Sequence, residues 1–235
     1  MAVYAGPEVV TNGLVLALDA GNTQSYPGSG TAWTDLSGNG NNGTLTNGPT
    51  FNSNNRGSIV FDGVNDYASL PTPSGTFYAT SMSVWIKRNG NQANWAAVFF
   101  DRLTAGTSNY AGILFRGDNG ATGPNQIIFA WNNLRIAGGQ SDLVLADNTW
   151  YMITMSVYSD WYAKFFVHGP SGVVSREVST YIAPYTFTGL QIAKESSYTD
   201  RHFKGNMGIA MMYNRALSDA EITQNFNALR GRFGI

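Results

Sequence analysis

Hydrophobic and polar residues alternate along many short stretches of this chain, as they do in β-strands that bury one face. In residues 150–157, apolar side chains occupy every odd-numbered position, and the even-numbered positions share the opposite face. Further strands are predicted at residues 13–20, 82–87, 96–100, 113–115, 126–131, 162–168, 173–178, 190–193 and 203–213. So many short strands separated by turn residues predict an all-β fold, a two-sheet antiparallel sandwich.

A β-hairpin is predicted at residues 59–70, with its turn at residues 62–66. Short apolar runs flank the turn, which contains glycine and asparagine, residues that tolerate positive φ. Asp62 and Asp66 sit on this turn, and two interpretations of them remain open. They support the turn by accepting bonds from backbone amides, or they contribute to a calcium site, since clustered carboxylates suit a hard cation.

Residues 21–58 form a polar, glycine-rich stretch whose composition is typical of a flexible linker. Four apolar side chains nevertheless recur through it: Trp33, Leu36, Leu45 and Phe51. We therefore expect an ordered segment that these side chains anchor to the body of the domain.

One helix is predicted near the C-terminus. Ser218 and Glu221 have the spacing of a capping box, in which the serine accepts from the N3 amide and the glutamate reaches back. Gly231 is placed to end the helix. The apolar stripe of this helix consists of Ile222, Phe226 and Leu229. We expect the stripe to lie on the sandwich surface or to close one of its ends.

The length of 235 residues fits one large β domain, and neither an internal repeat nor a domain boundary is evident. We expect residues 13–235 to form this single domain. Residues 1–12 lie outside the strand pattern and are expected to form an N-terminal arm that docks onto a neighbouring subunit.

Charged residues make up 12% of the chain, against about 25% in an average protein. With a net charge of −1, the chain lacks the electrostatic footprint of a nucleic-acid or anionic-membrane partner. The absence of cysteine excludes disulfides and thiolate metal sites. Residues 1–8 lack the features of a signal peptide, so export by that route is not expected.

Several motifs follow one another along the chain, at residues 33–45, 61–67, 83–87, 148–151, 166–169 and 203–218. In this order they resemble the laminin G-like, concanavalin A-like jelly-roll domains and cover nearly the whole chain. Residues 213–235 resemble versions of the domain found in bacteriophage structural proteins. The resemblance implies a jelly-roll sandwich, while its members include carbohydrate-binding modules, adhesion domains, virion surface proteins and some glycosidases.

A structural calcium ion is common in the domains that this chain resembles, and Asp62 and Asp66 match their turn motif. Many relatives also carry an acidic pair in the strand before Tyr213, where this chain has Gly208 and Ile209. The expectation is therefore no cofactor, or a structural calcium ion at the two aspartates.

An enzymatic function is not expected. Glycoside hydrolysis needs two carboxyl groups about 5–10 Å apart, one of them a proton donor. Glu8 lies in the arm and Glu221 belongs to the cap, and the alternating acidic motif of the related glucanases is absent. His168 is expected to support a turn and His202 to be solvated.

Aromatic side chains in or beside polar loops are the candidates for ligand contact, because sugars stack on tryptophan and tyrosine faces. These candidates are Trp95, Tyr110, Trp131, Trp161 and Tyr198. Packing in the core is the alternative for each of them, and it explains Trp85 and Trp150 better.

These features together predict a non-enzymatic protein of the virion surface, a capsid decoration protein or a tail or fibre adhesion domain. We expect it to bind other virion proteins, with a host-surface glycan as a further ligand, and to form a homo-oligomer on the particle. The alternatives are a free-standing carbohydrate-binding lectin and, third, a glycosidase.

Overall fold

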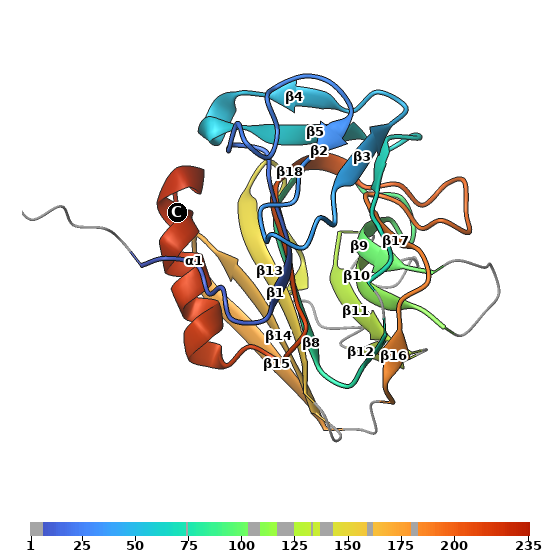
Figure 1. Ribbon diagram of the computed structural model, residues 1–235, viewed down its shortest axis with the longest axis vertical. Coiled ribbons are helices and arrows are strands. Elements are labelled where there is room, and N and C mark those ends of the chain that lie inside the picture. The colour runs from blue at the N-terminus through green and yellow to red at the C-terminus, as the bar shows by residue number, and fades with distance from the viewer. Residues whose placement is uncertain are drawn as a thin grey trace, which may run out of the picture.

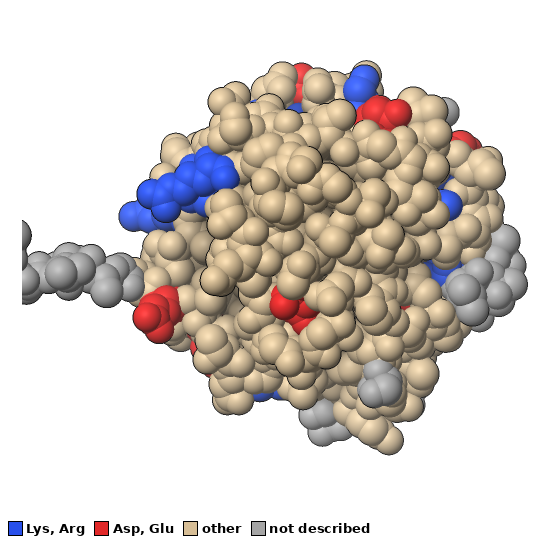
Figure 2. Space-filling model, turned by 45° about the horizontal axis from the view of Figure 1, so that its top comes forward, with Lys and Arg blue, Asp and Glu red and all other residues tan. Residues whose placement is uncertain are grey.

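The computed structural model describes residues 7–73, 75–102, 109–116, 125–132, 134–136, 143–158, 162–179 and 183–235. Two large antiparallel sheets face each other, and one helix covers the outer side of the first sheet (Figure 1). The predicted all-β, two-sheet jelly-roll architecture with a C-terminal helix is thus confirmed. Figure 2 shows that charged side chains occupy a small part of the face it presents, in keeping with the low charged fraction.

The first sheet contains β1 (Leu14–Asp19), β4 (Thr50–Asn52), β5 (Ser58–Asp62), β8 (Thr80–Arg88), β13 (Trp150–Tyr158), β14 (Tyr162–Gly169), β15 (Gly172–Ser179) and β18 (Lys204–Tyr213). Its order is β15-β14-β13-β8-β18-β5-β4, and β1 pairs with β18 beyond the end of β5. The strand β18 therefore has β8 along one edge and two successive partners along the other.

The second sheet contains β2 (Ala32–Trp33), β3 (Gly43–Thr46), β6 (Tyr67–Ser69), β9 (Ala97–Asp101), β10 (Ala111–Phe115), β11 (Ile127–Trp131), β12 (Leu134–Ile136) and β17 (Leu190–Ile192). Its order is β12-β11-β10-β9-β17-β6-β3-β2. Two smaller elements of the described chain lie outside these sheets. One is a two-stranded ribbon of β7 (Thr76–Phe77) and β16 (Tyr185–Thr186), and the other is a short 3-10 turn, η1 (Asn54–Arg56).

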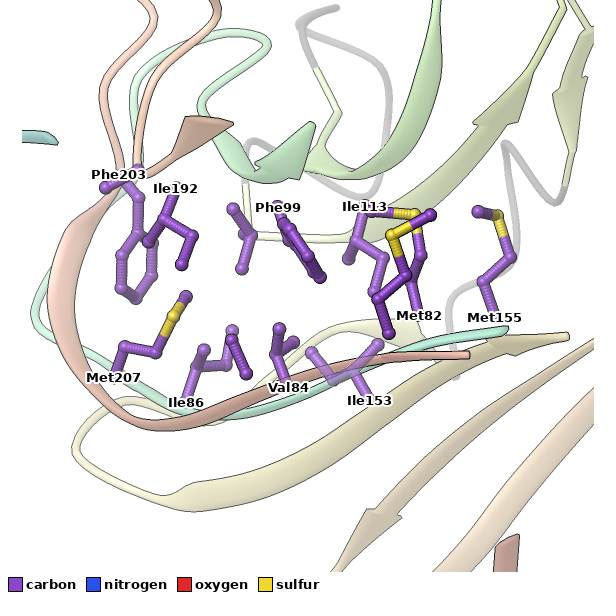
Figure 3. Close-up of a cluster of buried hydrophobic side chains, with 14 of the residues drawn as sticks. Met82, Val84, Ile86, Phe99, Ile113, Ile153, Met155, Ile192, Phe203 and Met207 are labelled. Carbon is purple, nitrogen blue, oxygen red and sulfur yellow. The ribbon is translucent and has the colours of Figure 1, made fainter. Parts of the chain in front are cut away.

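The main core lies between the two sheets. Figure 3 shows side chains of β8 (Met82, Val84 and Ile86) facing Phe99 and Ile113 from the second sheet. The predicted alternation in β13 is present, since its odd-numbered side chains from 153 to 157 join this core. The even-numbered side chains from 150 to 156 are also buried, because the helix and the segment before it cover the other side of the sheet.

The predicted hairpin at residues 59–70 is wrong in one respect. Both strands and the turn are present, but β5 belongs to the first sheet and β6 to the second, and the two do not pair. Ile59, Phe61 and Ala68 all point into the core between the sheets. The two strands are therefore held by side chains that they bury between the sheets, and not by the hydrogen-bond ladder of a hairpin.

The polar stretch at residues 21–58 is ordered, as predicted. Trp33 and Leu45 are buried and Phe51 packs against the core, but Leu36 is exposed and does not act as an anchor. Backbone bonds hold that part instead, with Leu36 N donating to Ala17 O at 2.8 Å.

Asp35 organises the same loop. Its buried carboxylate accepts hydrogen bonds from Ala17 N at 2.8 Å, Ser37 N at 2.9 Å and Asn41 N at 3.0 Å. One carboxylate thus ties the loop between β2 and β3 to the edge of β1, a role that its position in sequence does not reveal.

The helix α1 (Asp219–Phe233) begins with the predicted capping box, with both the Ser218 and Glu221 bonds present. Its end was predicted incorrectly, because the helix continues through Gly231 and stops at Gly234. Gly234 adopts the left-handed conformation, φ 73°, and its N–H donates to Arg230 O. The Phe233 ring packs on Trp85 and keeps the last turn against the sheet.

The described part of the N-terminal arm lies on the chain's own helix. Val10 N donates to Asn225 Oδ1 at 2.7 Å, and Val10 O accepts from the Tyr213 hydroxyl at 3.0 Å. Glu8 O accepts from Gln224 Nε2 at 2.8 Å. Among the described residues, no helix is long and apolar enough to cross a membrane.

Both histidines are buried, which corrects the expectation that His202 is solvated. The backbone of His202 forms β-bridges with Ala97 and Lys194, which hold this residue beside β9 and β17. His168 does not support a turn, because it lies on β14 with its ring stacked on Phe226 of α1 at 4.6 Å.

The position of His168 makes the stability of the domain depend on pH. Burial lowers the pKa of His168 to about 4, from 6.5 in an exposed histidine. The folded protein therefore holds this proton less tightly than the unfolded chain does. We expect full stability above about pH 6.5 and a loss that approaches about 3 kcal/mol as the pH falls to 4 and below. Denaturant unfolding measured across this range tests the expectation.

The variant His168→Gln is the matched control for this titration. It should lose most of the dependence between pH 6.5 and 4 and retain the part due to His202, whose pKa burial also lowers. An unchanged pH profile in His168→Gln would contradict the assignment.

Candidate functional site

The structure brings Trp95 and Tyr110 together on the face of the second sheet that points away from the core. Tyr110 stacks on Phe100 with ring centroids 6.1 Å apart, and Trp95 packs against the same small apolar cluster. The cluster also contains Leu114 and Ile128. Tyr110 is buried and Trp95 partly buried, so this face is largely closed around its aromatic side chains.

Trp131 lies elsewhere, in the main core. It is fully buried, its Nε1 donates to Ala183 O at 2.9 Å, and its ring contacts Tyr185 and Phe187. This position corresponds to the packing alternative stated for Trp131. Trp161 lies outside the described residues.

Tyr198 joins the outer face of the second sheet through a buried ionic network centred on Glu195. One carboxylate oxygen of Glu195 accepts from Arg102 Nη1 and the other from Arg201 Nη1, the latter at 2.6 Å. The Arg102 guanidinium lies 4.1 Å from the Tyr110 ring centroid, and that of Arg201 lies 3.4 Å from the Tyr198 centroid. Both tyrosines thus use a ring face for a cation–π contact within the protein.

Sequence reasoning missed this network because its members are far apart in the chain. Arg102 and Glu195 are 93 positions apart, and no local pattern marks them as partners. The low number of glutamates, four in the chain, is the one signal that could have drawn attention to Glu195.

Asp62 and Asp66 stabilise the turn between β5 and β6, in agreement with the first of the two interpretations. Asp62 Oδ1 accepts from the backbone N–H groups of Val64 at 2.7 Å, Asn65 at 3.2 Å and Asp66 at 3.4 Å. Asp66 Oδ2 accepts from Asp62 N at 3.1 Å. Desolvation acts to raise the pKa of Asp62, but these three donors and His202 leave it below its ordinary value. Desolvation, with the charge of Asp62, raises the pKa of Asp66.

This donor set does not fit a calcium ion. One carboxylate oxygen of each aspartate is committed to backbone N–H groups, and the Asp66 side chain is buried, so the turn offers few free oxygens to a hard cation. In the part of the chain that the structure describes, no three His, Asp or Glu side chains come together in a group that could hold a metal.

We therefore expect calcium to leave the stability of the domain unchanged. A bound ion at a hundred times its Kd would raise the free energy of unfolding by about 2.7 kcal/mol. Thermal unfolding with calcium and with a chelator should give the same midpoint, for the wild type and for Asp62→Asn alike. A calcium-dependent increase that Asp62→Asn removes would establish the ion site instead.

Two further acidic residues are held by donors. Asp101 is fully buried and accepts from the Tyr185 hydroxyl at 2.6 Å, Thr188 N at 3.0 Å and Gly189 N at 2.5 Å. Glu221 accepts from Arg215 Nη2 at 2.6 Å, and Arg215 lowers its pKa to about 2. Each carboxylate joins segments of the fold.

The sequence analysis also missed Tyr78. Among the large aromatic side chains of the described residues, it is the one that is exposed, at 67%. It lies between β7 and β8, in a stretch to which the sequence analysis assigned no element.

Comparisons with known proteins agree with the fold. A laminin G family model of the concanavalin A-like lectin/glucanases superfamily matches residues 62–223. A search of curated proteins finds no match.

Several solved structures have the same fold. Domain 4 of the arabinanase AbnA from Geobacillus stearothermophilus, solved with arabinotriose, has a TM-score of 0.67 at 16% identity, over 90% of this chain and 97% of that one. Trypanosoma rangeli sialidase has a TM-score of 0.67 at 14% identity, over 95% of this chain and 34% of the sialidase chain. The binding domain of botulinum neurotoxin serotype D has a TM-score of 0.62 at 13% identity, over 93% of this chain and 52% of the toxin chain.

These identities show a shared fold and no more. The present chain spans about a third of the length of the sialidase, and a larger share of the other two. The family match covers more than half of the chain and includes most strands of its two facing sheets. This chain therefore belongs to the concanavalin A-like lectin/glucanases superfamily.

Proposed function

We propose that this chain is a non-catalytic binding domain that attaches to carbohydrate. The superfamily name covers both lectins and glucanases, so the state of the acidic side chains distinguishes the two. The observation that carries the proposal is that the clustered and buried carboxylates are engaged by donors within the protein.

A glycosidase needs one carboxyl that gives up a proton and a second one about 5–10 Å away. Glu195 is buried and contacts two guanidinium groups, so its carboxylate oxygens are occupied within the protein, away from solvent. Glu221 has its pKa lowered to about 2 by Arg215, which removes it as a proton donor at neutral pH. Asp101 lies inside the core with its oxygens occupied.

The solved relatives support the carbohydrate half of the proposal. One was solved with arabinotriose and another with a sialic acid derivative, both in complexes with sugars. Their identity to this chain is low, so they motivate the choice of probes and leave the ligand of this domain to experiment.

A glycan array together with an assay for sugar release tests the proposal. The purified domain should bind members of the array, and incubation with the same glycans should release no reducing sugar. Release that is lost in an aspartate or glutamate variant would replace the proposal with a glycosidase. If the domain bound no glycan on the array, the proposed carbohydrate-binding function would be wrong.

The proposal includes a place on the virion surface, as a capsid decoration or a tail or fibre adhesion domain. The resemblance of residues 213–235 to bacteriophage structural proteins motivates it, and rigid sheets with polar loops suit attachment. Co-purification of the protein with intact particles is the expected result. A gene flanked by carbohydrate-utilisation genes, with no association with particles, would favour a free-standing lectin.

A further inference from the structure

We propose that the glycan-binding site is the groove beside Tyr78, where β1, β7 and the loop before β3 meet, and that its ligand is a neutral oligosaccharide. This inference rests on the proposed carbohydrate-binding function and adds the site and the ligand class. The groove has a volume of about 660 Å³. Sites for small organic ligands commonly enclose about 300–1,000 Å³.

Segments far apart in sequence form the walls. Val15 of β1 and Asn214, directly after β18, line the groove together with Thr76 and Phe77 of β7 and with Tyr78. Asn39 and Asn41 come from the loop between β2 and β3. Asn214 follows the end of β18 and Ala79 precedes the start of β8, so the groove lies at one end of the first sheet.

The asparagine wall is fixed in place by the edge of β1. Asn41 Nδ2 donates to Val15 O at 2.7 Å, and Asn39 Nδ2 donates to Leu14 O at 3.2 Å. Within the described chain the Oδ1 atoms of both residues accept no hydrogen bond. Each side-chain amide thus uses its Nδ2 group to bond the fold, and its Oδ1 atom can accept a hydrogen bond from a sugar hydroxyl.

The loop that carries these amides is itself rigid. Asp35 accepts from the Asn41 backbone N–H at 3.0 Å, and Asp35 N donates to Asn42 Oδ1 at 2.9 Å. The amides are therefore positioned before a ligand arrives, which reduces the entropy lost on binding.

The aromatic wall is supported from the core. Phe77 packs edge-on against Phe187 at 5.2 Å and pairs with Tyr185 in the β7–β16 ribbon. The Tyr185 hydroxyl in turn donates a hydrogen bond to Asp101 Oδ2 at 2.6 Å. This chain of contacts fixes the backbone next to Tyr78, while the Tyr78 side chain remains 67% exposed.

An exposed aromatic side chain beside fixed amide groups is suited to a sugar. The ring face takes the apolar C–H face of the sugar, and amides bond its hydroxyls in defined directions. The other lining side chains are Pro73, Thr76 and Ala79, and none of the lining residues is charged. A site without charged groups has no partner for a carboxylate or sulfate, so burying an acidic sugar there is unfavourable.

Binding of the intact chain to an array of neutral and acidic oligosaccharides, followed by titration with the best neutral binder, tests the inference. Tyr78→Ala should weaken binding by about tenfold or more, because it removes the stacking surface. Tyr78→Phe should retain most of the affinity, since it keeps the ring. Tyr78 is exposed, so its replacement leaves folding intact. Val173→Ala is the control, because Val173 is an exposed apolar side chain on β15, outside the groove.

The outcomes separate the two proposals. Binding of neutral sugars that Tyr78→Ala weakens and Val173→Ala does not supports the groove. Undiminished binding by Tyr78→Ala, or a loss in Tyr198→Ala instead, overturns the groove and leaves the lectin function standing. Selective binding of acidic sugars overturns the ligand class. Binding to no glycan at all overturns the proposed function, and the inference with it.

Discussion

Replacing Glu195 with glutamine should lower the free energy of unfolding by about 3–5 kcal/mol, the range found when one partner of a buried ion pair is removed. Glu195 is 1% exposed, and its carboxylate contacts both Arg102 and Arg201. The substitution keeps the size of the side chain but leaves two guanidinium groups without their counter-charge, and that of Arg102 is nearly buried. Denaturant unfolding followed by fluorescence measures the change.

Glu177→Gln provides the matched control for Glu195→Gln. Glu177 also pairs with a cation, Lys164 at 3.1 Å, but its side chain is 58% exposed. An exposed pair of this kind is screened by solvent, so Glu177→Gln should change the free energy of unfolding far less than Glu195→Gln does. Equal effects of the two substitutions would show that the network around Glu195 is not the buried structural element described above.

The second large effect is expected from Phe233→Ala, at about 3–5 kcal/mol of lost stability. The Phe233 ring is almost completely buried, stacks on Trp85 at 4.3 Å and packs at a tilt against Trp150 at 4.6 Å. Removing it leaves a cavity beneath the last turn of α1. Because both tryptophans line that cavity, their fluorescence should change together with the unfolding midpoint.

Val64→Ala is the control for Phe233→Ala, since Val64 is an exposed apolar side chain on the turn after β5. A surface change of this kind is expected to stay within about 0.5 kcal/mol. A loss below about 1 kcal/mol in Phe233→Ala would mean that α1 contributes little to the fold. Gly208→Ala offers an independent test from the other side, because a Cβ at Gly208 would lie 2.7 Å from the Phe233 ring.

The candidate site was only partly predictable from sequence. The rule that aromatic residues near polar loops contact ligands selected Trp131, which the fold buries completely, and passed over Tyr78, which the fold exposes. That Asn39 and Asn41 line the same groove as Tyr78 depends on how β1 and β7 pack, and no spacing in the chain records it.

The sequence by itself determined the features that depend on close neighbours along the chain. Alternation predicted the strand β13, the spacing of Ser218 and Glu221 predicted the start of α1, and the aspartates at 62 and 66 predicted a turn. These follow from backbone preferences and hydrogen bonds that span a few residues.

Only the tertiary structure decided what covers each face and which distant groups meet. It separated β5 and β6 into opposite sheets, carried α1 past Gly231 so that Phe233 could pack on Trp85, and paired Glu195 with Arg102. Burial and charge pairing depend on segments that approach one another only when the whole chain is folded. A local pattern therefore indicates which residues form a strand, but not which of its faces remains open to a ligand.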